Sequence, residues 1–306
     1  MNQPRRPKRR VDGVLLLDKP YRITSNGALQ KARWLYQAAK AGHTGVLDPL
    51  ATGLLPICFG EATKFSSYLL DADKRYRATV RFGQVSSTGD SEGEIVLERP
   101  IAFIEADLRS VIDAFVGEIE QVPPMYSALK HQGRALYEYA RAGVEIERKA
   151  RRVTIHSIDL IEFDGVSAVI DVSCSKGTYI RTLGQDIGEA LGAGGHLTAL
   201  RRLSTAGFPL EESRTLEDVE SLPLEQRDLL LLPVDVLVAH LPAVELGVDD
   251  YGRLSHGQPV RISENYETMS RFRVYHQVTR EFVGLAEARG DGMLHPVRLL
   301  SVAQDL

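Results

Sequence analysis

The stretch GHTGVLDPLATG, residues 42–53, separates two periodic segments of the chain and has no periodicity of its own. Its residues include three glycines, one proline, one histidine and one aspartate. This composition predicts an irregular loop rather than a core element. An aspartate before a proline commonly forms a turn, so a plain connector is the simpler interpretation of Asp48. In the alternative, functional interpretation, the glycines admit a closely approaching chain, and Pro49 restricts the backbone that carries the acid.

Strand-like and helical patterns surround this loop. Residues 14–17 and 54–60 predict short buried strands, and Thr24 or Ser25 is expected to cap a helix that runs to about residue 40. In KRYRATVRFG, residues 74–83, Tyr76 shares one strand face with three apolar residues. Strand-like alternation returns in residues 151–163 and 167–183, and residues 183–192 predict a helix. From about residue 251, short strands with glycine turns predict a small β-barrel-like module.

The composition is that of a globular chain: 306 residues, 43% of them hydrophobic and 25% charged. The net charge of −4 conceals a basic segment at residues 125–152, with seven Lys or Arg against three Glu. No apolar run approaches the roughly 20 residues of a membrane span, and none resembles a signal peptide, so we expect a cytoplasmic protein. Cys58 and Cys174 predict small buried residues rather than a disulfide, and the histidines lack metal-binding spacing.

Three polar groups are candidates for chemistry. Asp48 could serve as nucleophile or general base if it is ionised and well oriented, with His43 as its partner or as another turn residue. In SKGTYIRTL, residues 175–183, a strand would place Tyr179 and Arg181 on one face. That face is either a solvated strand edge or the source of a counter-charge that keeps the pKa of Asp48 low. Tyr76 is either a core aromatic or a platform on which a flipped nucleobase stacks.

The basic segment at 125–152 also carries several tyrosines. It is either a solvated helical face or an RNA-contacting surface, and its pattern favours neither. The five basic residues among the first ten are similarly either a plain tail or an electrostatic hook. Taken alone, these patterns predict an RNA-contacting α+β protein of enzymatic or non-enzymatic type.

Longer strings are more specific. GVLLLDKP followed by TS, AGHTGVLDPLATGLLPICFGEATKF, KRYRATVRFG, PPMYSALKHQGRALYEYAR, CSKGTYIRTL and LRRL occur in this order. Together they resemble the bacterial tRNA pseudouridine synthase B (TruB) family, densely over residues 11 to about 210. The resemblance implies an α+β fold with a mixed, largely antiparallel β-sheet pseudouridine synthase core flanked by helices. It also implies a basic flexible tail (1–10), a catalytic domain (11–250) with a tRNA-binding thumb insert (about 122–152), and a small C-terminal β-barrel-like PUA module that binds RNA (251–306).

The activity that this resemblance implies is isomerisation of uridine to pseudouridine at position 55, in the T-loop of tRNA, by base flipping. The enzyme would act alone as a monomer on the tRNA T-arm, without cofactor, metal, membrane or protein partner. Asp48 matches the catalytic aspartate and Arg181 its ion-pair partner. The residue types leave three steps open for Asp48: attack at C6, attack at C1′ or removal of a ribose proton. The other matching residues are the nucleotide-pocket residues His43, Tyr76, Tyr179 and Leu200, and the RNA-backbone contacts Lys19, Lys64, Lys130, Arg134 and Arg141.

One position departs from the family pattern, because Arg22 stands where glycine is usual. A side chain at positive φ costs about 1 kcal/mol, so we expect the turn to adjust. Two rivals to the synthase are a guide-RNA-dependent enzyme of dyskerin type and a non-catalytic tRNA-binding or tRNA-folding protein. The insert and the short C-terminal module disfavour the first rival, and the intact Asp48, Tyr76 and Arg181 disfavour the second.

Overall fold

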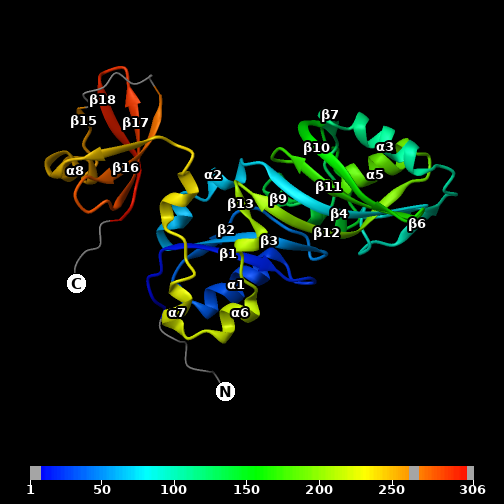
Figure 1. Ribbon diagram of the computed structural model, residues 1–306, viewed down its shortest axis with the longest axis horizontal. Helices are drawn as coiled ribbons and strands as arrows, with labels where there is room; N and C mark the ends of the chain where they lie inside the picture. Colours follow the sequence, from blue (N-terminus) through cyan, green and yellow to red (C-terminus); the bar gives the residue numbers. More distant parts are fainter. Residues whose placement is uncertain (1–7, 262–268, 302–306) are drawn as a thin grey trace.

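The computed structural model describes residues 8–261 and 269–301, so most of the predicted basic tail lies outside the described residues. Its larger sheet has nine strands, with the main order β1-β3-β12-β4-β11-β10-β7 (Figure 1). Every pairing in it is antiparallel except that of β3 with β12, which confirms the predicted largely antiparallel α+β core. The strands are β1 (Gly13–Lys19), β2 (Ala41–His43), β3 (Ala51–Phe59), β4 (Lys74–Phe82), β7 (Gly117–Gln121), β10 (Arg151–Phe163), β11 (Ser167–Cys174), β12 (Gly195–Thr205) and β13 (Phe208–Pro209).

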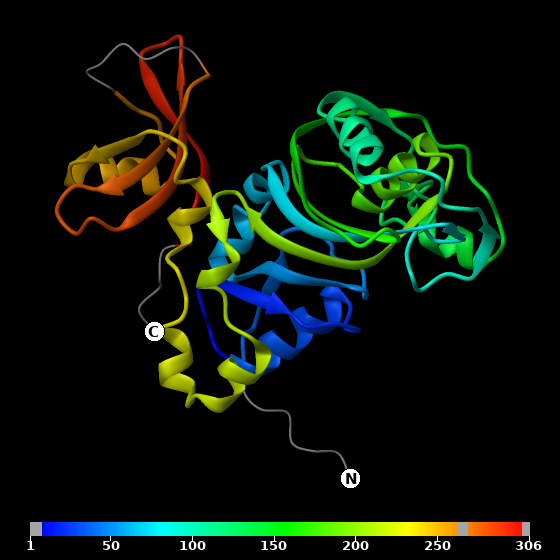
Figure 2. The ribbon, with the colours of Figure 1, turned by 45° about the vertical axis from the view of Figure 1, so that its right-hand side comes forward.

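Helices cover both ends of this sheet. Near β1 and β3 lie α1 (Ser25–Leu35) and α6 (Leu216–Ser221), followed by α7 (Leu224–Asp228). At the other end, α3 (Glu105–Ala114) contacts β10, and α5 (Ile180–Ala190) contacts β4 and β12 (Figure 2). A short β-hairpin, β5 (Gln84–Ser86) and β6 (Ile95–Glu98), follows β4. The main core therefore lies between the sheet and these two groups of helices.

The predicted start of α1 is confirmed, and its predicted end is wrong. The Thr24 side chain caps the helix by accepting a hydrogen bond from the Gly27 N–H. The helix ends at Leu35 rather than near residue 40, because Gln37 adopts a φ of 52°, which a helix does not tolerate. The strand predicted at residues 54–60 begins earlier, at Ala51, where β3 pairs with Leu200 of β12. The alternation predicted around Tyr76 is confirmed, since Tyr76, Ala78, Val80 and Phe82 are all buried.

The sequence predicted that the turn at Arg22 would adjust to avoid positive φ, and this prediction is wrong. Arg22 keeps a φ of 64°, in the left-handed region that glycine adopts most easily. Its backbone N–H donates to the Pro49 carbonyl at 2.9 Å. This hydrogen bond to the loop that carries Asp48 explains why the strained conformation persists despite a cost of about 1 kcal/mol.

The predicted insert leaves and re-enters the sheet at one place. Strand β7 ends at Gln121 and β10 begins at Arg151, and these two residues are paired with each other. Between them lie β8 (Lys130–His131), β9 (Arg134–Ala135) and α4 (Leu136–Arg141). The insert is thus an elaboration on an unbroken β-ladder, which leaves the sheet's register unaffected by its length.

A second, five-stranded sheet forms the C-terminal module, with the order β14-β16-β17-β18-β15. It begins with β14 at Ala243, before the boundary expected at residue 251. Phe282 of this module packs against Phe65, which follows η1 (Gly60–Lys64) in the larger part of the chain, with ring centroids 5.6 Å apart. Its elements are β14 (Ala243–Leu246), α8 (Val248–Ser255), β15 (Val260–Arg261), β16 (Arg271–His276), β17 (Phe282–Arg289) and β18 (Met293–Leu299).

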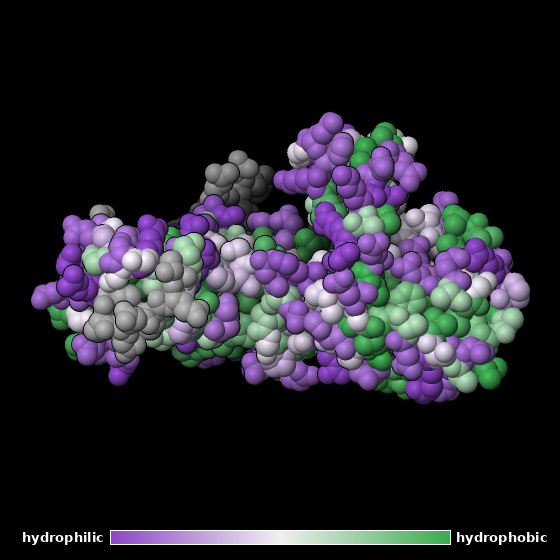
Figure 3. Space-filling view, turned by 90° about the horizontal axis from the view of Figure 1, so that it is seen from above, coloured by the Kyte–Doolittle hydropathy of each residue, from purple (hydrophilic) through white to green (hydrophobic). Residues whose placement is uncertain are grey.

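The short connections are 3-10 turns: η1 (Gly60–Lys64), η2 (Leu210–Glu212) and η3 (Val234–Val238), with the single-turn helix α2 (Ser67–Leu70) after η1. Seen from above, hydrophilic side chains cover much of the C-terminal module and of the larger part of the chain, and apolar side chains are interspersed chiefly on the larger part (Figure 3). Among the described residues, none of the helices combines the length and apolarity that a bilayer crossing requires.

Gly53 and Gly45, both within residues 42–53, should respond differently to replacement by alanine. Both have positive φ, 99° and 98°, so either substitution should destabilise the fold by about 1–2 kcal/mol. A Cβ on Gly53 would also lie 2.4 Å from the Arg202 carbonyl oxygen, whereas one on Gly45 would meet Arg202 Nη1 at an ordinary 3.5 Å. We expect Gly53→Ala to lower the unfolding free energy by about 1–3 kcal/mol more than Gly45→Ala, in urea unfolding. Equal losses would contradict the close approach of β12.

Candidate active site

The loop between β2 and β3, residues 44–50, is held in place by hydrogen bonds to Ser25 and by two buried leucines. The Ser25 hydroxyl, at the start of α1, accepts a hydrogen bond from the Leu47 N–H at 2.8 Å and donates to the Leu47 carbonyl at 3.0 Å. The predicted absence of regular structure is confirmed for residues 44–50 only, because residues 42–43 belong to β2 and residues 51–53 belong to β3. The prediction that the segment lies outside the core is wrong, because Leu47 and Leu50 are buried in it. The loop is therefore a fixed platform for Asp48. Sequence reasoning considered Ser25 only as a helix cap and missed this role.

Asp48 forms an ion pair with Arg181. The Nε of Arg181 lies 3.0 Å from Oδ2 of Asp48, and its side chain is 6% exposed against 36% for Asp48. Arg181 also donates from Nη1 to the Thr88 carbonyl and from Nη2 to the Tyr126 carbonyl. The guanidinium is thus held by three chain segments, which leaves the Asp48 carboxylate as the more exposed partner.

Tyr179 and Arg181 do not lie on a strand, contrary to the sequence-based expectation. The strand ends at Cys174, and Tyr179 is the residue that precedes α5. Arg181 therefore lies in the first turn of a helix whose Ile180, Leu183 and Ile187 face the core at helical spacing. That spacing competed with the strand pattern over the same residues, and tertiary packing selected the helix. Gln121 also holds Tyr179, accepting from its N–H and donating to its carbonyl.

A second carboxylate, Asp90, is a site residue that the sequence did not reveal. It is 2% exposed, and its Oδ2 lies 3.7 Å from the Arg181 Nε. Thr88 and the Glu92 N–H donate to its Oδ1. The surrounding string STGDSEGE has the composition of a loop, so only the long-range contact with Arg181 identifies the residue.

The electrostatics of Asp48 reflect a balance between burial and its partners. Burial raises the pKa of the Asp48 carboxyl and the nearby Asp90 raises it further, while Arg181 and Lys19 act in the opposite direction. The net shift is upward. Burial lowers the pKa of His43, and the charge of Arg202 lowers it as well. Backbone hydrogen bonds at Gly45 oppose this, but the net pKa shift is downward and favours the neutral imidazole, whose Nδ1 is buried without a hydrogen-bond partner.

The other predicted pocket residues lie on the central strands and at the start of α5. Leu200 is buried in β12, paired with Ala78 of β4, and Tyr76 is two residues away on the same face of β4. Asp48 influences the pKa values of both Tyr76 and Tyr179, which burial raises. The fold therefore brings together Asp48, Arg181, Tyr76, Tyr179 and Leu200, although they are far apart in sequence.

The predicted RNA-backbone residues fall into two groups. Lys19 is fully buried and donates to the Pro20 and Ile23 carbonyls, and burial lowers its pKa to about 8. Lys64 donates to Glu61, the Leu299 carbonyl and Ser301. Both arrangements favour a structural role over a free cation. The three in the insert are exposed: Lys130, Arg134 and Arg141.

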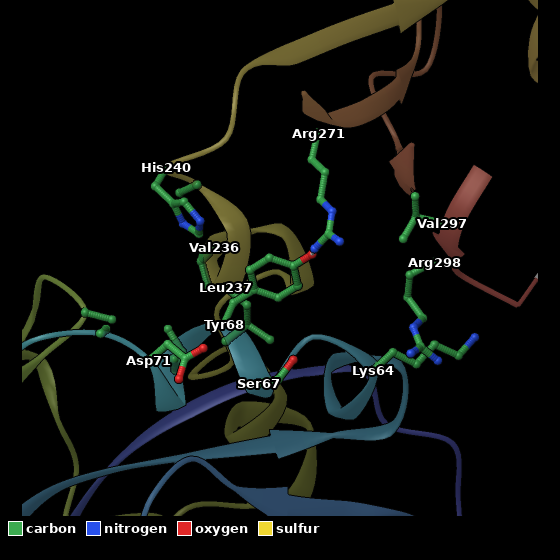
Figure 4. Close-up of a pocket in the computed structure, with 14 residues that line it drawn as sticks. Lys64, Ser67, Tyr68, Asp71, Val236, Leu237, His240, Arg271, Val297 and Arg298 are labelled. Atoms are coloured by element: carbon green, nitrogen blue, oxygen red, sulfur yellow. The ribbon is translucent and has the colours of Figure 1, made fainter. Parts of the chain in front are cut away.

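A cavity of about 720 Å³ lies between the C-terminal module and the segment that includes η1 and α2 (Figure 4). Tyr68 and Arg271 point toward each other from its two sides, and the Arg271 Nη1 donates to the Tyr68 hydroxyl at 3.2 Å. Neither Asp48 nor Arg181 lines this cavity. Among the described residues, His, Cys, Asp and Glu side chains form no group of three or more that could hold a metal ion.

Comparison with known proteins places the chain in a family. The profile described as TruB family pseudouridylate synthase (N terminal domain) matches residues 33–180. Two C-terminal profiles, tRNA pseudouridylate synthase B C-terminal domain and Pseudouridine synthase II TruB, C-terminal, match residues 181–239 and 242–300. A Chromobacterium violaceum protein named tRNA pseudouridine synthase B is 67% identical over 98% of both chains. A Neisseria meningitidis protein of the same name is 55% identical over 99% of both.

Solved structures share the fold at lower identity. The chain resembles one in a crystal structure of a Cbf5-Nop10-Gar1 complex, with a TM-score of 0.69 and 28% identity. That match covers 90% of this chain and 78% of the other. Because near relatives match at up to 67% identity over almost the whole chain, this protein belongs to the TruB family of pseudouridine synthases and is an isomerase.

Proposed function

We propose that the protein converts uridine to pseudouridine at position 55, in the T-loop of tRNA, acting alone and without a cofactor. The observation that carries the proposal is the Asp48–Arg181 ion pair beside Tyr76, Tyr179 and Leu200, in a chain whose near relatives are named tRNA pseudouridine synthase B. The reaction breaks the N1–C1′ bond of uridine and forms a C5–C1′ bond. The freed base must be held and turned between these steps, which an aromatic-lined pocket favours.

Access to the base requires energy that the RNA-binding surfaces can supply. A uracil within a folded tRNA loop must be unstacked before its reacting atoms are reached, at a cost of a few kcal/mol. The insert presents three exposed cations, and two of them lie over tyrosine rings: Arg134 over Tyr139 at 4.9 Å and Arg141 over Tyr137 at 5.3 Å. Cations combined with aromatic faces suit contacts to phosphates and to unstacked bases.

In the pocket, Asp48 acts as an ionised carboxylate oriented by Arg181. The Arg181 guanidinium is itself fixed by the Thr88 and Tyr126 carbonyls, so the carboxylate keeps one orientation without help from the substrate. Such preorganisation avoids reorganisation during the reaction. Tyr76 stacks on the flipped uracil, and His43 lies at the position that the base has left.

The decisive experiment is to map pseudouridine in unmodified tRNA after incubation with the purified protein. We expect modification at one uridine of the T-loop without any guide RNA or added cofactor. A guide-dependent enzyme would be inactive in this assay, and a non-catalytic tRNA-binding protein would bind the tRNA without modifying it.

Asp48→Asn removes the negative charge with little change in shape. We expect pseudouridine formation to fall by at least about 10³-fold, because the carboxylate acts at the reacting nucleotide. Binding of tRNA, measured by filter retention, should stay within about tenfold, since the acid acts after docking. Asp113→Asn, at an exposed carboxylate on α3, serves as the control and should remain active. A near wild-type rate for Asp48→Asn would exclude the catalytic assignment.

The raised pKa of Asp48 predicts an acid limb in the pH–rate profile. The ionised form is the active one, so the single-turnover rate should decline as pH falls through this pKa, above the ordinary value of 3.8 for an aspartate. Asp90→Asn removes a charge that raises this pKa, so it should move the acid limb to lower pH whatever its effect on the plateau rate. With Asp113→Asn as the control, an unmoved limb would show that the limb reports another group.

Replacement of Lys130, Arg134 and Arg141 by Gln tests the insert. We expect weaker tRNA binding and a smaller dependence of log Kd on log salt, by about one unit of slope for each lost phosphate contact. The matched control replaces Lys31, Arg99 and Arg109, which pair with surface carboxylates. If both triple variants changed the slope equally, the effect would come from net charge and not from the insert.

A further inference from the structure

Arg202 is a buried cation that the proposed reaction has not yet used. It lies in β12, its side chain is 1% exposed, and its Nε donates to the Leu54 carbonyl at 2.6 Å. Its Nη2 is buried without a hydrogen-bond partner. Across residues 8–261 and 269–301, Arg202 forms no ion pair, whereas the adjacent Arg201 pairs with Asp18 at 2.6 Å. An unpaired buried guanidinium destabilises a fold, so its presence calls for a functional reason.

The surroundings of Arg202 connect it to the site. In the sheet it is paired with Tyr76 of β4 on one side and with Gly53 of β3 on the other. Paired residues of neighbouring strands present their side chains on the same face, so Arg202 shares its face with Tyr76 and, two residues away, with Leu200. A Cβ on Gly45 would lie 3.5 Å from Arg202 Nη1, which brings the guanidinium against the loop that carries Asp48.

Arginine has donors only, and this fixes the roles at the contact with Tyr76. In any contact between the two side chains, the phenol oxygen of Tyr76 accepts from the guanidinium, and its own hydrogen is directed away from Arg202. The titratable and charged groups that face the phenol are Arg202 from β12, Cys174 from β11 and Asp48 from the loop. Burial raises the pKa of Tyr76, and Arg202 opposes this rise through its charge and through hydrogen bonding.

We propose that Arg202 is a positioning residue that donates to the Tyr76 phenol oxygen and so fixes the orientation of the ring on which the flipped base stacks. The inference rests on the proposed function, in which Tyr76 stacks on that base. A lysine at this position would keep the charge but lose the planar fork that holds the phenol.

A double-mutant cycle in single-turnover assays tests the coupling between the two residues. We expect Arg202→Lys to slow pseudouridine formation by about 10- to 100-fold in the wild-type background, but by less than about threefold in Tyr76→Phe, which keeps the ring and lacks the hydroxyl. Arg201→Lys, on the opposite face, should stay within about threefold in both backgrounds. Equal effects of Arg202→Lys in both backgrounds would overturn the proposal and would show that Arg202 only stabilises the loop that carries Asp48.

A second measurement does not depend on activity. Titration of ¹³C-labelled tyrosine by NMR, with Tyr76→Phe used for assignment, should show Tyr76 ionising at higher pH in Arg202→Gln than in the wild type. Thermal unfolding establishes that the variant is folded. An unchanged titration of Tyr76 would refute the contact. A wild-type protein that forms no pseudouridine would instead refute the proposed function, so the two failures are distinguishable.

Discussion

The arrangement of the whole site depends on one ion pair, between Asp48 and Arg181. A guanidinium that is 6% exposed is stable only if its donors are satisfied, and a single carboxylate does not satisfy them. The Thr88 and Tyr126 carbonyls accept one hydrogen bond each, from Nη1 and Nη2, so the segment after β5 and the start of the insert converge on α5. The requirement to satisfy one buried charge thus brings together segments that share no local sequence signal.

The same ion pair is joined to the insert at residues 122–150. Tyr126 lies in the insert, five residues beyond the end of β7, and its carbonyl holds the residue that orients Asp48. The β7–β10 ladder closes the base of the insert, so the exposed cations project from a rigid base. Under the proposed function, RNA bound by the insert and a base bound beside Asp48 would therefore be positioned by one connected set of contacts.

Local patterns predicted the parts of this fold that local forces determine. The alternation around Tyr76 and the Thr24 cap follow from side-chain spacing and helix-end chemistry, and both are present. The start of α5 was mispredicted as a strand because packing against the sheet, rather than the local pattern, selects the helix. Asp90 was missed because its partner Arg181 is more than 90 residues away in the sequence. The pocket residues came from the family resemblance, since no single-residue pattern distinguishes Leu200 from any other core leucine.

The two buried arginines of the site have opposite electrostatic tasks. Arg181 faces two carboxylates and favours the anionic form of Asp48, although burial opposes this. Arg202 has no acidic partner among the described residues, and its charge lowers the pKa of His43 and opposes the rise in that of Tyr76. A histidine that favours its neutral form does not compete with Arg181 for Asp48, and in our proposal the donor at Arg202 holds the Tyr76 ring in one orientation. Under the proposed function, the pocket can therefore combine an anionic carboxylate with an imidazole that favours its neutral form and an oriented phenol, because Arg181 acts on Asp48 whereas Arg202 acts on His43 and Tyr76.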